Sequence, residues 1–216
     1  MFNYEFNDDE LLKQALTHRS LGNNNNERLE YLGDAILGFV IADALFRKFP
    51  NASEGELTRL RAYLVKGERL AEIASQHNLQ DAINLGPGEL KSGGWRRKSV
   101  LANSLEAILG AIFLDSDFAS CQRVVLDLYQ PYLDSINISD IKKDAKTRLQ
   151  EHLQSRQLNT PVYKIINQTG SPHNPHFQVS CQVDSLDNDI LAEGKSRRKA
   201  EQAAAEKALL ILTENK

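Results

Sequence analysis

The chain has 216 residues, of which 41% are hydrophobic and 25% are charged, the composition of a folded rather than a disordered protein. No apolar run approaches the ~20 residues that a membrane-spanning helix needs, and the acidic start MFNYEFNDDE leads us to expect no secretory signal. The net charge of −3 combines an acidic part, with 14 Lys+Arg against 20 Asp+Glu in residues 1–141 (balance −6), and a basic part, with 12 against 9 in residues 142–216 (balance +3). Such a division suggests carboxylate chemistry beside polyanion binding.

Helical periodicity dominates the first part and predicts an all-α domain over residues 1–135. Asn26 and Ser53 are N-cap candidates for two of its helices. The Gly-rich, basic segment 86–98 is expected to be an exposed loop, and no strand pattern of convincing length occurs before residue 160. The expected helices cover residues 8–18, 27–48, 54–76, 99–115 and 117–134.

The second expected helix carries acids that its composition does not explain. It is apolar on nearly every side, yet Glu30 and Asp34 lie one turn apart in it, and Glu27 lies at its start. Like charges at this spacing repel, and a carboxylate buried without a partner costs more still. The acids therefore need a compensating group.

A counterpart occurs in the helix expected at 99–115, where Asn103 and Glu106 are also one turn apart among apolar residues. Each helix has a glycine four residues after its last acid, Gly38 and Gly110, and we expect these glycines to let the two backbones approach closely. Converging carboxylate and amide oxygens form a site for Mg²⁺, which can generate a nucleophilic hydroxide and stabilise the leaving oxygen of a phosphodiester.

The pattern changes after a linker expected at residues 136–143. A helix over about 144–156 is followed by strand patterns at 162–169 and 176–183, then ILAEGK and an alanine-rich helix. This order predicts a small α+β domain, α-β-β-β-α, over residues 144–214, with both helices on one face of the sheet. Cys121 and Cys181 match no metal or redox spacing, which predicts two buried thiols in a reducing compartment.

Several segments resemble ribonuclease III. NERLEYLGDAIL (26–37) is similar to the signature segment of that family, and the resemblance extends to ALTHRS (15–20), EGELTRLRAYLV (54–65) and KSGGWRRKSVLANSLEAILGAIFLD (91–115). The C-terminal part, with GSPHNPHF (170–177) and GKSRRKAEQAAAEKAL (194–209), resembles a double-stranded-RNA-binding domain. Together these segments cover nearly the whole chain.

For the first domain, the resemblance implies a helical nuclease that acts as a homodimer with an Mg²⁺ site in each subunit, where Mn²⁺ can substitute. Glu30, Asp34 and Glu106 match metal-binding positions of the family, with Asp34 and Glu106 also catalytic. Glu27 and Glu54 are expected to support them. Tyr31 matches an aromatic residue that inserts into a socket on the partner subunit.

At Asn103 the sequence departs from the family pattern, which usually has aspartate there. Asparagine keeps an acceptor oxygen but loses the charge. Either the amide oxygen still holds the metal or its water and the enzyme is active, or the second metal is weakened and the protein binds duplexes without cutting them. The three retained acids favour activity.

For the second domain, the resemblance implies recognition of duplex RNA by shape, through two successive minor grooves and the phosphates between them. The residues assigned to this surface are Thr147, Gln150, Glu151 and Gln154 on one face of the first helix, His173 in the loop between two strands, and Lys195, Arg198 and Lys199 at the start of the last helix.

These features lead us to expect an Mg²⁺-dependent endoribonuclease that cuts double-stranded RNA into products with 5′-phosphate and 3′-hydroxyl ends. By the family resemblance it would process ribosomal RNA precursors and messenger RNA in the cytoplasm. The alternative is a duplex-binding protein whose cleavage is weakened or lost through Asn103.

Overall fold

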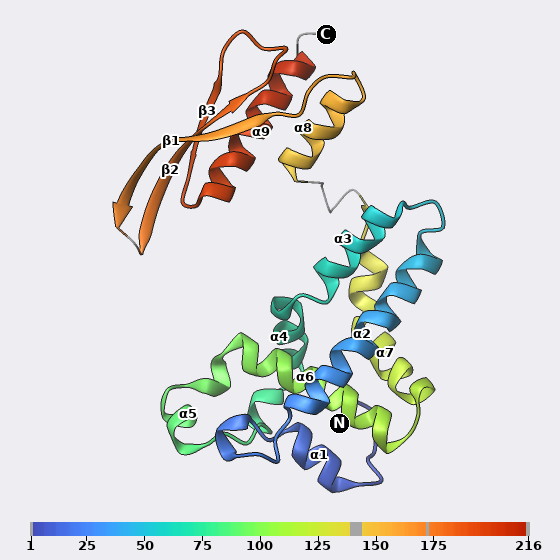
Figure 1. The fold of residues 1–216 in the computed structure, drawn as a ribbon. Coiled ribbons are helices and arrows are strands. Elements are labelled where there is room, and N and C mark those ends of the chain that lie inside the picture. Colours follow the sequence, from blue (N-terminus) through green and yellow to red (C-terminus); the bar gives the residue numbers. More distant parts are fainter. Residues whose placement is uncertain (1, 139–143, 172, 215–216) are drawn as a thin grey trace. The chain divides into compact units, whose positions relative to one another are not determined.

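The computed structural model describes residues 2–138, 144–171 and 173–214, and the chain divides into two compact units, Met1–Ile141 and Lys142–Lys216 (Figure 1). The first unit is helical and the second has the order α-β-β-β-α, so the expected fold class is confirmed. Among the described residues, no helix is both long enough and apolar enough to cross a membrane.

Helices α2 and α6 form the centre of the first unit and make its most extensive contact. Both have buried residues on several sides, and their apolar side chains supply much of the core. The helices of this unit are α1 (Asp9–Ala15), α2 (Glu27–Lys48), α3 (Glu54–Leu64), α4 (Gly67–Gln76), α5 (Pro87–Lys91), α6 (Lys98–Asp115) and α7 (Phe118–Ser135).

Two glycines bring the backbones of α2 and α6 into direct contact. A Cβ atom on Gly33 would lie 1.8 Å from the carbonyl oxygen of Glu106, and one on Gly110 would lie 2.3 Å from that of Leu29. The expectation for Gly110 is thus confirmed, but that for Gly38 is wrong, because a Cβ there would meet nothing within 4 Å. Gly33 replaces Gly38 because it lies on the face of α2 that meets α6.

The prediction of a single helix over residues 54–76 is wrong, because this segment forms two helices, α3 and α4. Lys66 has extended backbone (φ −64°, ψ 145°) and separates α3 from α4. The break lets α3 pack on α2 while α4 packs on α6, which one straight helix could not do. Ser53 does cap α3, in a reciprocal capping box with Glu56.

Two other expectations about the first unit also change. The segment 86–98 is not a plain loop: it contains α5, which starts with Pro87 at its first position, and a short 3₁₀ turn at Gly94–Arg96. The first helix ends at Ala15 rather than residue 18, because Thr17 forms an isolated bridge with Asn84.

The linker expected at 136–143 lies partly outside the described residues, which omit 139–143. Before that gap, Ile136 is buried and Ile138 is half-buried against the core of the first unit. Cys121 and Cys181 are both buried free thiols, as expected.

In the second unit, a three-stranded antiparallel sheet of order β1-β2-β3 is covered on one face by two helices (Figure 1). Val179, Cys181 and Val183 alternate along the chain and are all buried, and Cys181 and Val183 belong to the same core as the buried alanines of α9. The elements are α8 (Ala145–Gln154), β1 (Val162–Ser171), β2 (Asn174–Gln182), β3 (Ile190–Gly194) and α9 (Arg197–Glu214).

Gly33→Ala should strongly destabilise the first unit, since the new methyl group would overlap the backbone of α6. Gly38→Ala in the same helix is the matched control and should stabilise the unit by about 0.5–1 kcal/mol, the ordinary gain of alanine over glycine in a helix. Urea unfolding followed by circular dichroism measures both. Equal effects of the two substitutions would contradict the backbone contact.

Candidate active site and duplex-binding surface

The acids of α2 lie at its first turns. Glu30 is half-buried, Asp34 is exposed, and Glu27 is exposed and pairs with Arg19, with 3.5 Å between Oε1 and Nη1. Burial raises the pKa of Glu30 above its usual value, a hydrogen bond from Asn103 acts in the opposite direction, and the charges of Glu27 and Asp34 add to the increase. Helix α2 therefore presents carboxylates that are poorly compensated by the protein itself.

Helix α6 brings Asn103 and Glu106 to the same place. Both are half-buried, and Asn103 reaches Glu30 of α2 through the hydrogen bond just described. Burial, followed by the charges of Asp34 and Glu30, raises the pKa of Glu106 to about 7. Glu106 thus lies near enough to Asp34 and Glu30 to respond to their charges, and Asn103 bonds to Glu30; the expected role of these four residues as metal ligands stays a prediction.

This donor set fits a hard divalent cation. No three acidic, histidine or cysteine side chains among the described residues lie close enough together to hold a metal ion by themselves. Mg²⁺ does not require such a cluster, because it commonly keeps several waters and takes only one or two carboxylates. Burial is the main cause of the raised pKa of Glu106 and the charges of Asp34 and Glu30 add to it; a bound cation would favour the ionised carboxylate against both effects.

Glu54 does not join these acids within the subunit. It lies at the exposed start of α3, accepts a hydrogen bond from Thr58 (2.8 Å) and lines a separate, largely apolar cavity of about 540 Å³ with Phe39 and Phe46. Its expected supporting role therefore stays a prediction.

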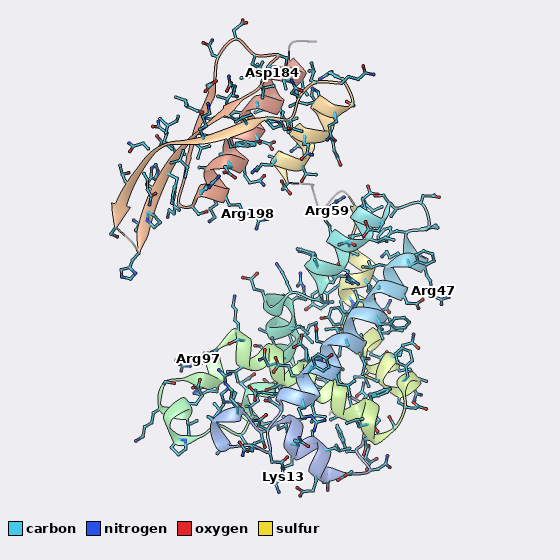
Figure 2. The ribbon with its side chains drawn as sticks, in the orientation of Figure 1. Lys13, Arg47, Arg59, Arg97, Asp184 and Arg198 are labelled. Carbon is cyan, nitrogen blue, oxygen red and sulfur yellow. The ribbon has the colours of Figure 1, made fainter. Side chains whose placement is uncertain are left out.

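A polar cleft of about 750 Å³ opens beside the acids and is lined by Glu27, Glu30 and Asn103. Basic residues also line it, namely Arg19 and Arg97. Figure 2 shows Arg97 on the segment between α5 and α6. These arginines are not among the site residues expected from the sequence, although the segments ALTHRS and 91–115 contain them.

Tyr31 is 81% exposed on α2, unlike an ordinary core aromatic. Phe39 and Phe46, farther along the same helix, are 60% and 69% exposed. Exposed aromatic side chains of this number are typical of a surface that meets another protein.

The residues chosen on α8 lie on the helix surface, with Gln150, Glu151 and Gln154 exposed and Thr147 half-buried. Thr147 is also part of the helix cap, because its backbone N–H and its hydroxyl both donate to Asp144. The other three leave an exposed polar face that can meet a minor groove.

His173 is exposed in the short turn between β1 and β2. These strands extend to Ser171 and Asn174, farther than expected, so the histidine lies at the tip of a long hairpin. Gly170 has φ +88°, a conformation that favours glycine, whereas Pro172 lies outside the described residues.

Two groups of basic residues lie at or against α9. Lys146 and Arg148 of α8 form ion pairs with Glu201 and Glu206 of α9 and so help to hold the two helices together, whereas Arg197 pairs with Glu201 within α9. The second group is exposed and has no ion pair within the described part of the chain (Figure 2 labels Arg198); it consists of Lys195, Arg198 and Lys199. These cations lie at the N-terminal end of α9, where the helix dipole also attracts phosphate.

Comparisons with known proteins match the two units of the chain separately. A family model described as ribonuclease-III-like matches residues 8–133, and one described as a double-stranded RNA binding motif matches residues 145–212. A structure of the nuclease domain of ribonuclease III from Campylobacter jejuni, described for flexibility in a region involved in dimer formation, is 44% identical, with a TM-score of 0.59. The match covers 60% of this chain and 92% of that one.

Two further structures are similar. Another structure of the Campylobacter jejuni nuclease domain is 43% identical, covers 63% of this chain and 93% of that one, and gives a TM-score of 0.60. A Dicer from Pichia stipitis is 25% identical over 95% of each chain, with a TM-score of 0.51. The likeness to Dicer therefore includes both units of the chain.

The double substitution Arg198→Ala and Lys199→Ala should weaken binding to an RNA duplex and reduce the slope of log K against log salt by about one unit per residue. Lys164→Ala, which removes an exposed cation from β1, is the control and should change neither quantity. Fluorescence anisotropy at several salt concentrations measures both. An unchanged salt slope in the double variant would show that these cations do not meet phosphate.

Proposed function

The chain belongs to the ribonuclease III family, and on this premise we propose that it is an Mg²⁺-dependent endoribonuclease that cuts double-stranded RNA as a homodimer. The observation that carries the proposal is the convergence of Glu30 and Asp34 of α2 with Glu106 of α6: burial raises the pKa of Glu106 to about 7, and the charges of Asp34 and Glu30 add to the increase. Protein structures bury uncompensated carboxylates at such a cost mainly where a cation or a reaction requires them.

Glu30, Asp34, Asn103 and Glu106 are proposed to hold the metal, one or two of the carboxylates directly and the other groups through its waters. A bound Mg²⁺ would supply a water of lowered pKa and stabilise the charge on the leaving oxygen. Asn103, which bonds to Glu30, orients that carboxylate. Asp34 and Glu106 complete the acidic surface from the two helices and are proposed as catalytic, with Glu27 at its edge.

The second unit would hold the duplex while the first cuts it. Its unpaired cations at the start of α9 provide affinity without reading sequence, as expected for recognition of a duplex by shape. Hydrolysis would leave 5′-phosphate and 3′-hydroxyl ends. Precursors of ribosomal RNA and structured messenger RNA, processed in the cytoplasm, are the proposed substrates.

Dimer formation is proposed from the exposed aromatic side chains of α2. Tyr31 would insert into the partner subunit, and Phe39 and Phe46 would be covered in the same assembly. Their exposure in a single chain supports this proposal because so much aromatic surface is normally buried against another molecule.

Glu106→Gln should lower the rate of duplex cleavage at least about a hundredfold, because it removes a charged ligand, while leaving duplex affinity unchanged. Glu10→Gln on α1, an exposed acid that pairs only with Lys13, is the matched control and should cut normally. Cleavage of an end-labelled duplex and a gel shift measure the two properties. Equal loss of cleavage and binding would sink the assignment of Glu106.

A second candidate, a duplex-binding protein without cleavage, is favoured by one observation: the amide of Asn103 stands among the acids of the site. Asn103→Asp distinguishes the candidates in the same assay. If the unaltered protein and the variant both cut, the amide is a tolerated ligand and the enzyme proposal stands. If both bind and only the aspartate variant cuts, the protein is a duplex binder built on a nuclease fold.

A further inference from the structure

Asn26 occupies the N-cap position of α2 but does not cap the helix. Its backbone is already in the helical region (φ −84°, ψ −7°), and its side chain makes no capping hydrogen bond. The neighbouring Asn25 does this instead, because its Oδ1 accepts from the backbone N–H of Glu27 at 2.9 Å. The side chain of Asn26 therefore does not make the capping hydrogen bond that was expected of it.

The side chain of Asn26 is nevertheless enclosed. The residue is only 2% exposed, and its Nδ2 atom has no hydrogen-bond partner within the described residues. Its backbone is held in place, since its N–H donates to Thr17 and its carbonyl accepts from Glu30. Buried N–H donors are nearly always satisfied in folded proteins, by protein or by ordered water, so this donor is available to an acceptor that enters the cleft with a ligand.

Asn26 also lines the polar cleft of about 750 Å³ that contains Glu30 and Asn103. The ligand that satisfies it would therefore lie next to the proposed cation site. A neutral amide donor suits an anionic oxygen, because it gives a charge-assisted hydrogen bond without adding a charge of its own.

Arg97 and the first turn of α6 line the same cleft. The guanidinium of Arg97 forms an ion pair with Glu89 (2.7 Å) and donates to the hydroxyl of Ser92 (3.1 Å), while its side chain stays 52% exposed to the cleft and solvent. Arg97 is the N-cap residue of the 18-residue helix α6, so unpaired backbone N–H groups and the positive end of the helix dipole lie beside it. A held guanidinium next to a helix N-terminus favours phosphate.

We propose that Asn26 and Arg97, together with the first turn of α6, form a subsite for one backbone phosphate of the RNA, adjacent to the acids. The inference deepens the proposed nuclease function and rests on it. The carboxylates in the cleft are compatible with a phosphate there, because Glu27 pairs with Arg19, Glu89 pairs with Arg97, and Glu30 is a proposed ligand of the cation. The phosphate enters as part of a duplex held by the second unit.

The subsite is tested with Asn26→Ala, whose kcat/KM for duplex cleavage should fall about 10- to 100-fold, the loss expected for a hydrogen bond to a charged oxygen. Duplex affinity should change less than twofold, since the cations of α9 supply most of it. Asn26→Ser keeps a donor and should recover part of the rate. Arg123→Ala, on α7 and outside the cleft, is the control and should cut normally.

A scan of methylphosphonates, which replace one charged phosphate oxygen at a time, locates the contact. The unaltered protein should lose rate at one phosphate near the cut, and Asn26→Ala should show no further loss at that phosphate. Thermal melting checks that the variants are folded. A folded Asn26→Ala protein that cuts at the unaltered rate would overturn the subsite and leave the nuclease proposal standing.

A binding measurement tests the subsite even if the unaltered protein does not cut, an outcome that would count against the proposed function alone. In Glu106→Gln protein with Mg²⁺, the side-chain amide resonances of Asn26 should shift when duplex RNA is added. Replacing RNA with inorganic phosphate at the same phosphate concentration should give a smaller shift. Unmoved resonances with a bound duplex would overturn the subsite.

Discussion

The contact between α2 and α6 is made backbone against backbone, and the rest of the site depends on it. Gly33 leaves room for the carbonyl of Glu106, and Gly110 leaves room for that of Leu29. Each glycine costs roughly 0.5–1 kcal/mol relative to alanine in a helix, a cost that the close packing must offset. The acids lie on the same turns as these glycines, so the close approach of α2 and α6 also brings Glu30 and Asp34 near Glu106.

In the isolated subunit, the proximity of these carboxylates is electrostatically unfavourable. Glu106 is half-buried and faces Asp34 and Glu30, and its carboxylate is therefore harder to ionise than usual. Arg19 and Arg97 line the cleft beside Glu30, and Arg61 lines a pocket with Asp34. In the second unit, the acids Glu201 and Glu206 are paired, and Lys195, Arg198 and Lys199 are exposed without an ion pair among the described residues. The centre of the first unit thus gathers acids, whereas the start of α9 leaves cations available for a polyanion.

Local patterns predicted much of this molecule. The span of α2, the order of the second unit and the acids at positions 30, 34 and 106 all follow from periodicity or from a chemically unusual motif. The break at Lys66 did not, because it depends on α3 and α4 packing against different helices. The choice of Gly33 over Gly38 likewise depends on which face of α2 meets α6, which periodicity does not define in a helix that is apolar on nearly every side. Asn26 was assigned to a cap because residue type and position agreed, yet Asn25 performs that function.

We propose that α2 and α6 together hold one divalent cation. Titration with Mn²⁺, followed by the loss of the free-ion electron paramagnetic resonance signal, tests this site without requiring catalysis or RNA. A shared site should give binding in the unaltered protein that is weakened by Glu30→Gln on α2 and equally by Glu106→Gln on α6. Binding that survives either substitution unchanged would contradict a shared site and would leave the convergence of these acids without an explanation.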